Sequence, residues 1–458
     1  MNKFGQSTLQ LIIPLILLLF VLLSLGILIP MLSTTSTIAL VIGLIIFLAS
    51  FASTEIALYI LIFSMLLSPE FIVGATEGAS LGRGVTVRFD DFILIIIGFS
   101  WLAKMSIHKE LGLFLRTPLN KPIAYYILIC LVSTLLGALF GRVQLMTGIF
   151  FVLKYFEYVI IYFMVTNLLE TRRQARYYLW AMLITCAIVS VIGISQIPLG
   201  GRVTAPFEGA SGEPNTFGGY LVFMISITFG LFLTSPSFRN QLIYSSLIVL
   251  FAIPLFYTQS RSSYLAVIPS LLTFLYLSEK RKWVIAAIAL IALSLPYITP
   301  DIAKKRISYT FTQGQDRMDV VEIGGVKLDT STSARLTSWK AAARDWNKHP
   351  LFGYGVTGYR FVDAQYVRVI TETGFLGLVS FLFLLTTVTK RTYGIFRSAA
   401  DHFEEGLVIG FLAGFMGLMF HAIGANTFII VRIMEPFWFM TALVISLPQL
   451  RDDHLKPL

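Results

Sequence analysis

Charged residues and cysteine are both scarce in this sequence. Of 458 residues only 13% are Asp, Glu, Lys or Arg, whereas 56% are hydrophobic. This balance excludes a soluble globular domain and indicates a polytopic membrane protein. The two cysteines, Cys130 and Cys186, lie in apolar runs, which argues against a disulfide framework and predicts two core residues. The five histidines are scattered without metal-ligand spacing, so we expect neither a metal nor a cofactor.

Fourteen apolar runs approach the length of about 20 residues that a membrane-spanning helix needs. The sequence therefore predicts an all-α polytopic integral membrane protein with about 14 transmembrane helices (12–14), forming one domain over residues 1–458. The first run, Leu11 to Ile29, lacks a cleavage signal and is expected to remain as a helix. The runs centre near residues 20, 42, 62, 97, 131, 157, 187, 224, 249, 270, 290, 379, 413 and 440.

Lys and Arg concentrate in alternate short loops, for example Lys104 to Lys121, Arg172 to Arg176 and Lys280 to Lys282. The opposite loops carry only single arginines. Because positive charge marks the cytoplasmic side, both termini are predicted to be cytoplasmic. The net charge of +10 arises mainly in these loops, so nucleic acid is not an expected partner.

The main polar interruption is the insert from Tyr297 to Val367, which the charge rule places outside the cytoplasm (residues 297–367). Within it a helix is predicted from Ala334, with Ser333 as its cap. Its apolar stripe is Leu336, Trp339, Ala343 and Trp346, and Arg335, Lys340, Arg344 and Lys348 occupy its other sides. Two interpretations stay open: a helix lying on the membrane surface, or a lid over an anionic lipid substrate.

Two outer loops carry an arginine in a polar setting. The segment GGRVTAPFEGASGEPNTFGGY contains Arg202, and TQSRSSYL contains Arg261 between Ser260 and Ser262, where one helix ends and the next begins. Arginine with neighbouring hydroxyls can hold a phosphate group. The alternative for each arginine is a side chain that snorkels at a helix end.

Carboxylates mark the return to the membrane. Asp363 precedes the next helix and Glu372 lies within it, so Asp363 is a candidate general base or, alternatively, a helix cap. We interpret His349 as a loop residue in preference to a general base. In the spans, Lys154 and Glu157 are expected to form an ion pair. Arg432 and Glu435, with His421 and Asn426, either extend the site or anchor a boundary.

In its C-terminal half the chain resembles the O-antigen ligase and polymerase superfamily of bacterial envelope glycosyltransferases. The resemblance rests on TQSRSSY, the two helices after it, the large loop, KHPLFGYGVTGYRF and ETGFLGL, in this order. It implies a metal-independent transferase in the inner membrane that acts on undecaprenyl-diphosphate-linked glycans at the periplasmic face. It also implies phosphate contacts for Arg261 and, less directly, Arg202. The expected catalytic residues are Asp363 and Arg261, and the expected substrate contacts are Arg202, Ser260, Ser262, Arg335, His349, Arg360, Tyr366 and Glu372.

The chain departs from the ligase pattern at one place. Ligases of this group typically have a His-Asn pair where this sequence has Asp363-Ala364-Gln365-Tyr366. The departure favours a polymerase of O-antigen or a related polysaccharide over a ligase that transfers glycan to lipid A core. A flippase is the third hypothesis, and it is disfavoured because the halves show no repeat. Expected partners are the lipid-linked oligosaccharide, membrane lipids and a chain-length regulator.

Overall fold

The computed structural model describes residues 34–73, 85–107, 117–208, 212–298, 322–323, 326–327 and 330–450. Long apolar runs form helices because a helix satisfies its own backbone hydrogen bonds in lipid. The helices are α2 (Thr34–Ala52), α3 (Thr54–Leu67), α4 (Phe89–Ile107), α5 (Asn120–Leu139), α6 (Leu145–Leu168), α7 (Arg172–Gln196), α8 (Pro214–Thr234), α9 (Phe238–Tyr257), α10 (Arg261–Leu277), α11 (Arg281–Ile298), α13 (Thr330–Trp346), α14 (Gln365–Arg397), α15 (His402–Gly424) and α16 (Val431–Ser446).

Short elements join these helices. Strands β1 (Glu70–Val73) and β2 (Val85–Arg88) pair antiparallel, with Glu70 opposite Arg88. Strands β3 (Glu322–Ile323) and β4 (Val326–Lys327) form a second antiparallel pair. Single-turn 3₁₀ helices are η3 (Ile197–Leu199), η5 (Thr427–Ile429) and η6 (Leu447–Gln449). Apart from these pieces and the loops that connect them, the described part of the chain is helical, as the sequence predicts.

The predicted spans agree in position with the observed helices. Every predicted centre from residue 42 onward falls inside a helix, and the centre near residue 20 lies outside the described residues. Within the described residues, eight helices are long and apolar enough to cross a membrane: α5, α6, α7, α8, α9, α14, α15 and α16. The structure therefore supports a multi-pass membrane protein. Among the described residues it supports fewer clear spans than the fourteen predicted. Helices α3 and α10 are short, with 14 and 17 residues, and α2, α4 and α11 are also not among the eight.

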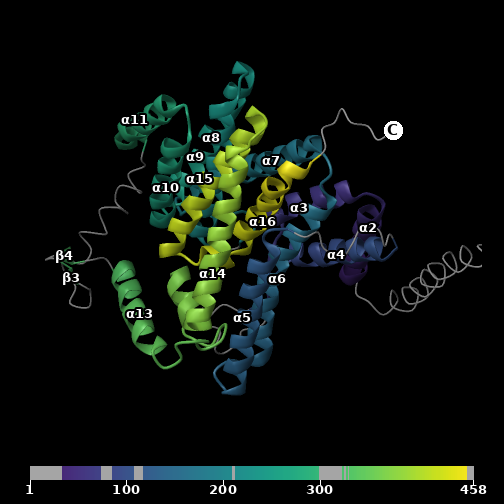
Figure 1. Cartoon of the computed structure of the whole chain (residues 1–458), viewed down its shortest axis with the longest axis vertical. Helices are drawn as coiled ribbons and strands as arrows, with labels where there is room; N and C mark the ends of the chain where they lie inside the picture. Colours follow the sequence, from purple (N-terminus) through teal and green to yellow (C-terminus); the bar gives the residue numbers. More distant parts are fainter. Residues whose placement is uncertain are drawn as a thin grey trace, which may run out of the picture.

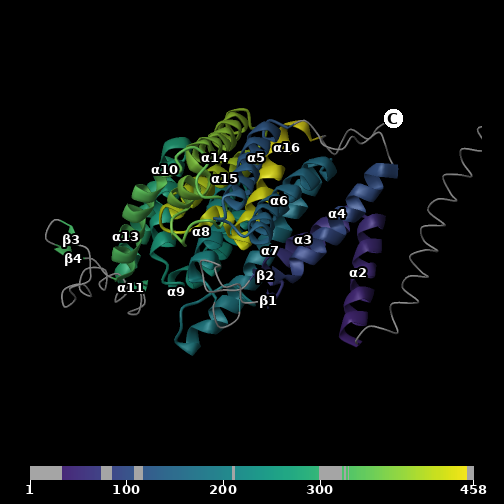
Figure 2. The same ribbon diagram turned by 90° about the horizontal axis from the view of Figure 1, so that it is seen from below.

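Helices α8, α15 and α16 form the centre of the molecule (Figure 1). The α8 and α15 backbones approach closely because glycines line the contact: a Cβ on Gly410 would lie 2.7 Å from the Cα of Ile227. Small residues permit such close packing in membranes. Both predicted core cysteines, Cys130 and Cys186, are buried and unpaired. Figures 1 and 2 place α2 and α4 at one edge of the bundle and α13 at the other.

Loops predicted to share a side of the membrane contact one another. Arg142, between α5 and α6, donates to the carbonyl of Gly353 in the insert at 3.3 Å. Arg202, between α7 and α8, donates to Thr258 between α9 and α10 at 3.0 Å. At the opposite end, Arg176 lies 3.2 Å from Asp401. The predicted grouping of loops therefore matches the contacts.

Helix α14 is broken at Gly374, whose φ of 68° and ψ of −167° suit glycine. The insert fills the break: the N–H groups of Phe375 and Leu376 donate to the carbonyls of Pro350 and Leu351, at 2.8 and 3.2 Å. In return, the N–H of Gly355 donates to the carbonyl of Glu372 at 2.8 Å. Irregular backbone is tolerated at this depth because the protein itself satisfies it. The insert is thereby fixed to the bundle.

The predicted start of the insert helix was wrong. Helix α13 begins at Thr330, so Ser333 lies inside it, 3% exposed, and does not cap it. The predicted apolar stripe was also wrong at one position, because Ala343 is exposed and its neighbour Ala342 is buried. Ala342 packs in a small cluster with Val362 and Ala364. Contacts with the chain before α14 thus decide which face of α13 is buried.

Candidate functional site

Arg261 occupies the first position of α10, after a tight turn from α9. Gln259 in this turn has a positive φ of 51°. Ser260 caps the helix, and its side chain accepts from the backbone N–H of Ser263 at 3.2 Å. Arg202 braces the turn by donating to the carbonyls of Thr258 and Gln259, at 3.0 and 3.2 Å. The predicted site arginines therefore lie together, and Arg202 supports the backbone that presents Arg261.

A chain of buried polar side chains lies behind this turn. The hydroxyl of Ser260 donates to Oδ1 of Asn215 at 2.7 Å, and that of Ser263 donates to Ser260 at 2.7 Å. Nε2 of His421 lies 3.2 Å from the Ser263 hydroxyl, and its Nδ1 lies 2.8 Å from that of Thr427. The chain ties α8, α10, α15 and η5 together. Such satisfied networks hold a site in one geometry.

The insert helix brings a second arginine to Arg261. Nη1 of Arg261 makes a long contact of 3.5 Å with Oγ1 of Thr332 on α13. One turn further, Arg335 donates to Oδ2 of Asp363 from Nη2 at 2.7 Å and from Nε at 3.2 Å. Three predicted site residues, Arg261, Arg335 and Asp363, are thus held around α13.

Asp363 does not cap α14. The N-cap residue is Ala364, and no side chain makes the capping hydrogen bond. Asp363 instead faces Arg335, and the two side chains are 24% and 22% exposed. No hydrogen bond from a described residue reaches its other oxygen, Oδ1. Asp363 therefore has one oxygen fixed by the arginine and one available at the rim.

Between α10, α13 and α15 lies a cavity of about 510 Å³. Arg261, Ser262 and Arg335 line it at the end where α10 begins. The apolar face of α10 continues from there for about 16 Å, at the helical rise of about 1.5 Å per residue. This volume falls in the usual range of ligand sites, about 300–1,000 Å³. The remaining lining residues include Leu265, Ile268, Pro269, Leu272, Leu336, Trp339, Phe420 and Ile423.

Several apolar residues of this cavity are exposed: Leu265 is 62% exposed, Ile268 55% and Phe420 53%. An exposed apolar strip beside guanidinium groups suits a ligand with an anionic head and a long apolar tail. We name this space, with the residues that line it, the arginine groove.

Two predicted substrate contacts lie away from the arginine groove. His349 follows the far end of α13, where its ring packs edge-on against Tyr354 with centroids 4.7 Å apart. Burial lowers the pKa of His349, and the nearby charges of Arg142 and Lys348 lower it further, so the ring is neutral at pH 7. Arg360 is exposed, with its guanidinium over the ring of Tyr359 at 5.5 Å. The structure does not bring either residue to Arg261.

Glu372 and Tyr366, both on α14, make hydrogen bonds to other parts of the protein. Oε1 of Glu372 accepts from Nε of Arg368 at 3.0 Å and from the N–H of Thr357 at 3.3 Å, and the residue is 5% exposed. The hydroxyl of Tyr366 donates to the carbonyl of Met419 on α15 at 2.8 Å. These contacts position α14 against the insert and against the wall of the arginine groove.

The four residues proposed to extend the site divide into two groups. His421 contacts Ser263, and Nδ2 of Asn426 donates to the carbonyl of Val362, next to Asp363, at 2.9 Å. Arg432 and Glu435 instead lie toward α3 and α4: Nη1 of Arg432 donates to the carbonyl of Leu66 at 2.9 Å. Only His421 and Asn426 support the arginine groove.

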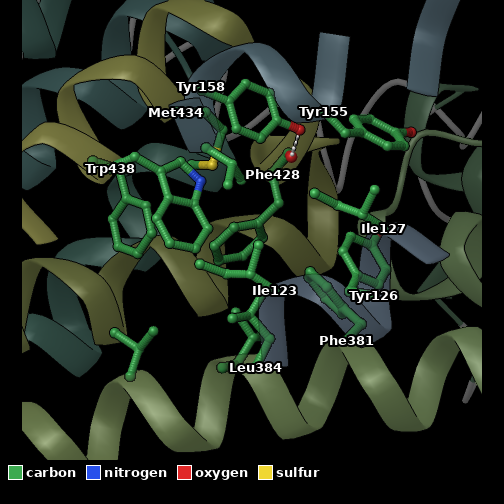
Figure 3. Close-up of a pocket in the computed structure, with 14 residues that line it drawn as sticks. Ile123, Tyr126, Ile127, Tyr155, Tyr158, Phe381, Leu384, Phe428, Met434 and Trp438 are labelled. Atoms are coloured by element: carbon green, nitrogen blue, oxygen red, sulfur yellow. Dashed lines mark hydrogen bonds between the residues drawn. The ribbon is translucent and has the colours of Figure 1, made fainter. Parts of the chain in front are cut away.

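A second cavity lies among α5, α6, α14 and α16 (Figure 3). Figure 3 shows aromatic side chains around it, with the hydroxyl of Tyr158 donating to the carbonyl of Phe428 at 3.1 Å. Its volume of about 30 Å³ matches the share of one water molecule, so it is too small for a sugar or an isoprenoid unit. The arginine groove is the larger candidate site by far.

Residues 246–382 match the O-antigen ligase family. The matched segment contains α10, α13 and the first half of α14, and therefore Arg261, Arg335 and Asp363. This match confirms the resemblance to the O-antigen ligase and polymerase superfamily, and it supports a role in the assembly of surface polysaccharide. No curated protein sequence matches the chain.

Arg261 and Arg335 were both predicted from the sequence, but the contacts that close the site were not. The Arg335–Asp363 pair joins residues 28 positions apart, and the apolar wall from Phe420 and Ile423 belongs to α15. Neither the pair nor the wall follows from local spacing. The spacing on α10 was an available signal, since Arg261, Leu265, Ile268 and Leu272 follow one another at helical intervals.

Proposed function

We propose that this protein polymerises O-antigen or a related surface polysaccharide from undecaprenyl-diphosphate-linked repeat units. The observation that carries the proposal is the arginine groove, in which Arg261 and Arg335 stand at one end of an apolar cavity. Arginine binds phosphate oxygens through paired N–H groups. The apolar strip of α10 and α15 provides a surface for the isoprenoid tail.

The arrangement accounts for each part of glycosyl transfer. The bond between the anomeric carbon and the diphosphate oxygen breaks, and the diphosphate leaves with the electron pair. Arg261 and Arg335 stabilise the negative charge that develops on it, as fixed cations do at other leaving groups. The hydroxyl oxygen of the acceptor sugar forms the new bond to the anomeric carbon, and its proton passes to Asp363.

The placement of Asp363 supports its role as the base. Its Oδ2 is held by Arg335, and its Oδ1 is the oxygen that receives the proton. Because Arg335 faces both Asp363 and the arginine groove, the acceptor hydroxyl and the leaving diphosphate are brought to the same side of α13. A hydroxyl within about 3 Å of the base is the geometry that general-base catalysis needs.

The departure from the ligase pattern favours the polymerase. Two residues after Asp363 the chain has Gln365, which is 1% exposed and accepts from the N–H of Phe428 at 3.0 Å. Gln365 therefore fixes η5 against α14 and is turned away from substrate. The description of the matched family favours a second candidate, a ligase that transfers lipid-linked glycan to lipid A core.

Analysis of surface polysaccharide in a deletion strain tests the proposal and separates the two candidates. If the protein is the polymerase, the deletion strain carries lipid A core with a single repeat unit. Long lipid-linked chains that accumulate without reaching core would establish the ligase instead. Normal surface polysaccharide in the deletion strain would remove both candidates.

The proposal includes a location and partners. The protein lies in the bacterial inner membrane with both termini in the cytoplasm, and the arginine groove opens at the periplasmic face. It uses the lipid diphosphate as leaving group and requires no metal or cofactor. A chain-length regulator is its proposed protein partner.

A further inference from the structure

Charged side chains gather inside the bundle, on the other side of α16 from the arginine groove. They come from the end of β2 and from α4, α6 and α16, where these helices pack near α3. Only the Lys154–Glu157 pair was predicted from the sequence, and it is confirmed at 2.9 Å. We name the following residues the buried charge cluster: Arg88, Asp90, Asp91, Lys154, Glu157 and Glu435.

The cluster contains two cations, and each lies between two carboxyl groups. Arg88 is hydrogen-bonded to Asp90, lies 3.8 Å from Glu435, and donates to the carbonyl of Met65 on α3 at 2.7 Å. Lys154 is hydrogen-bonded to Asp91 and paired with Glu157. Each cation thus interacts with two carboxyl groups.

The carboxyl groups also face one another. The carboxyl groups of each pair meet at one nitrogen atom: Nη2 of Arg88 contacts Asp90 and lies 3.8 Å from Glu435, and Nζ of Lys154 contacts Asp91 and lies 2.9 Å from Glu157. A hydrogen bond between two carboxyl groups requires a proton on one of them. Glu435 and Asp90 are 0% exposed, and neither oxygen of Glu435 has a hydrogen-bond donor among the described residues. A proton between Glu435 and Asp90 would supply the missing donor.

Charge counting leads to the same result. Counted over the described residues, four carboxylates and two cations would leave two uncompensated negative charges in a dry interior, an arrangement that proteins avoid. The next cation on α16, Arg432, does not compensate them, because it pairs with Glu208 at 3.7 Å and donates to the carbonyls of Leu66, Ser68 and Pro206. One proton on each carboxyl pair makes the buried charge cluster neutral.

The two pairs differ in accessibility. The side chains of Asp91, Lys154 and Glu157 are 10–14% exposed, whereas those of Asp90 and Glu435 are completely buried. Asp91 adjoins Asp90 in the chain, so the accessible pair lies next to the buried pair. The hydroxyl of Tyr158, the next residue on α6, donates to Phe428 and does not supply a proton to Glu157.

We propose that the buried charge cluster is a site for two protons, one on each carboxyl pair, and that it fills from the medium through Asp91 and Glu157. The ligand is a proton: among the described residues, no group of three or more His, Cys, Asp or Glu side chains is arranged to hold a metal ion. The site is separate from the arginine groove, and the proposal does not depend on glycosyl transfer.

Infrared spectroscopy of the purified full-length protein tests this proposal directly. At pH 7 we expect a carbonyl band of protonated carboxyl groups. In Glu435→Gln one of two protons is lost and the band falls by about half. Asp90→Asn removes the same proton, so the double variant loses no more than either single variant. Glu170→Gln, at an exposed position, is the matched control and leaves the band unchanged.

The wild-type protein provides a test that does not require the variants to fold. On transfer to heavy water, the band should shift in two steps, fast for the accessible pair and slow for the buried pair. Absence of a protonated carboxyl band at pH 7 would overturn the proposal. A band that Na⁺ or K⁺ abolishes at constant pH would overturn it too, because the site would then bind a metal cation.

Discussion

The Arg335–Asp363 pair permits a test of whether Asp363 accepts a proton or only holds the arginine. In Asp363→Asn the amide oxygen can still accept from Arg335, but the carboxylate is lost. Both side chains are more than a fifth exposed, and an ion pair of that kind contributes about 0–1 kcal/mol. The variant should therefore fold and insert normally, with a melting temperature close to that of the parent.

The two roles predict different rates. Loss of a general base lowers the rate by about 10²–10⁴-fold, measured as polymerisation of purified lipid-linked repeat units. Loss of one charge-stabilising donor, as in Arg335→Gln, lowers it by about 10²–10³-fold. If Asp363 is the base, the double variant is slower than Arg335→Gln alone, because Arg335→Gln keeps the carboxylate that accepts the proton. If Asp363 only positions Arg335, the double variant is no slower than Arg335→Gln alone.

A matched aspartate in the insert provides the control. Asp345 is paired with Lys348 at 3.1 Å and accepts from the hydroxyl of Tyr359 at 2.8 Å, at the far end of α13. Asp345→Asn removes a comparable ion pair and should leave the rate unchanged. The base assignment is refuted if Asp363→Asn polymerises at the parent rate, or if the double variant shows no additional loss.

Three further predictions concern the arginine groove and the topology. Arg261→Ala should abolish activity in a folded protein, and Arg261→Lys should restore only part of it, because lysine lacks the paired donors; equal activity in the alanine variant would leave Arg261 a snorkelling residue. Leu265→Asn should raise KM for the lipid substrate by about tenfold or more, because burying a leucine side chain contributes about 1.5–3 kcal/mol. Val249→Asn, at an exposed position on α9, should leave KM unchanged. A reporter that is active only outside the cytoplasm should be active when inserted at residue 324, and a well-expressed but inactive fusion would contradict the predicted orientation.

Hydropathy predicted the positions of the helices because each span is a local property of about 20 residues. It also placed the Arg261 turn correctly, since Ser260 and Arg261 follow directly after an apolar run. The start of α13 was wrong for a physical reason. The segment from Thr330 to Ser333 is rich in Ser and Thr, which have little intrinsic helix preference, so contacts such as that of Thr332 with Arg261 decide where the helix begins.

The site itself was only partly predictable, because its parts meet through long-range contacts. Asp363 was interpreted as a base or a cap from its position before a helix, and the cap interpretation was wrong because the side chain turns to Arg335. The exposed apolar residues of α10 and α15 look like ordinary lipid-facing positions until α13 is placed beside them. Tertiary packing therefore converts two unremarkable helix faces into a candidate ligand site.

A hydropathy profile can reveal a charged residue inside a span, but it cannot reveal that residue's partners on other helices. Lys154 and Glu157 stood out because a charge inside a span is costly, and their spacing allowed a local pair. A local pair would have been neutral by itself, yet Lys154 also bonds Asp91, which leaves the carboxyls in excess. Glu435 gave no local signal, because its charged neighbour, Arg88, lies at the end of β2, far away in the sequence. An unbalanced charge count among spans is therefore a reason to expect either a distant partner or a bound proton. Here the distant partners are present, yet the described carboxyl groups of the buried charge cluster still outnumber its cations.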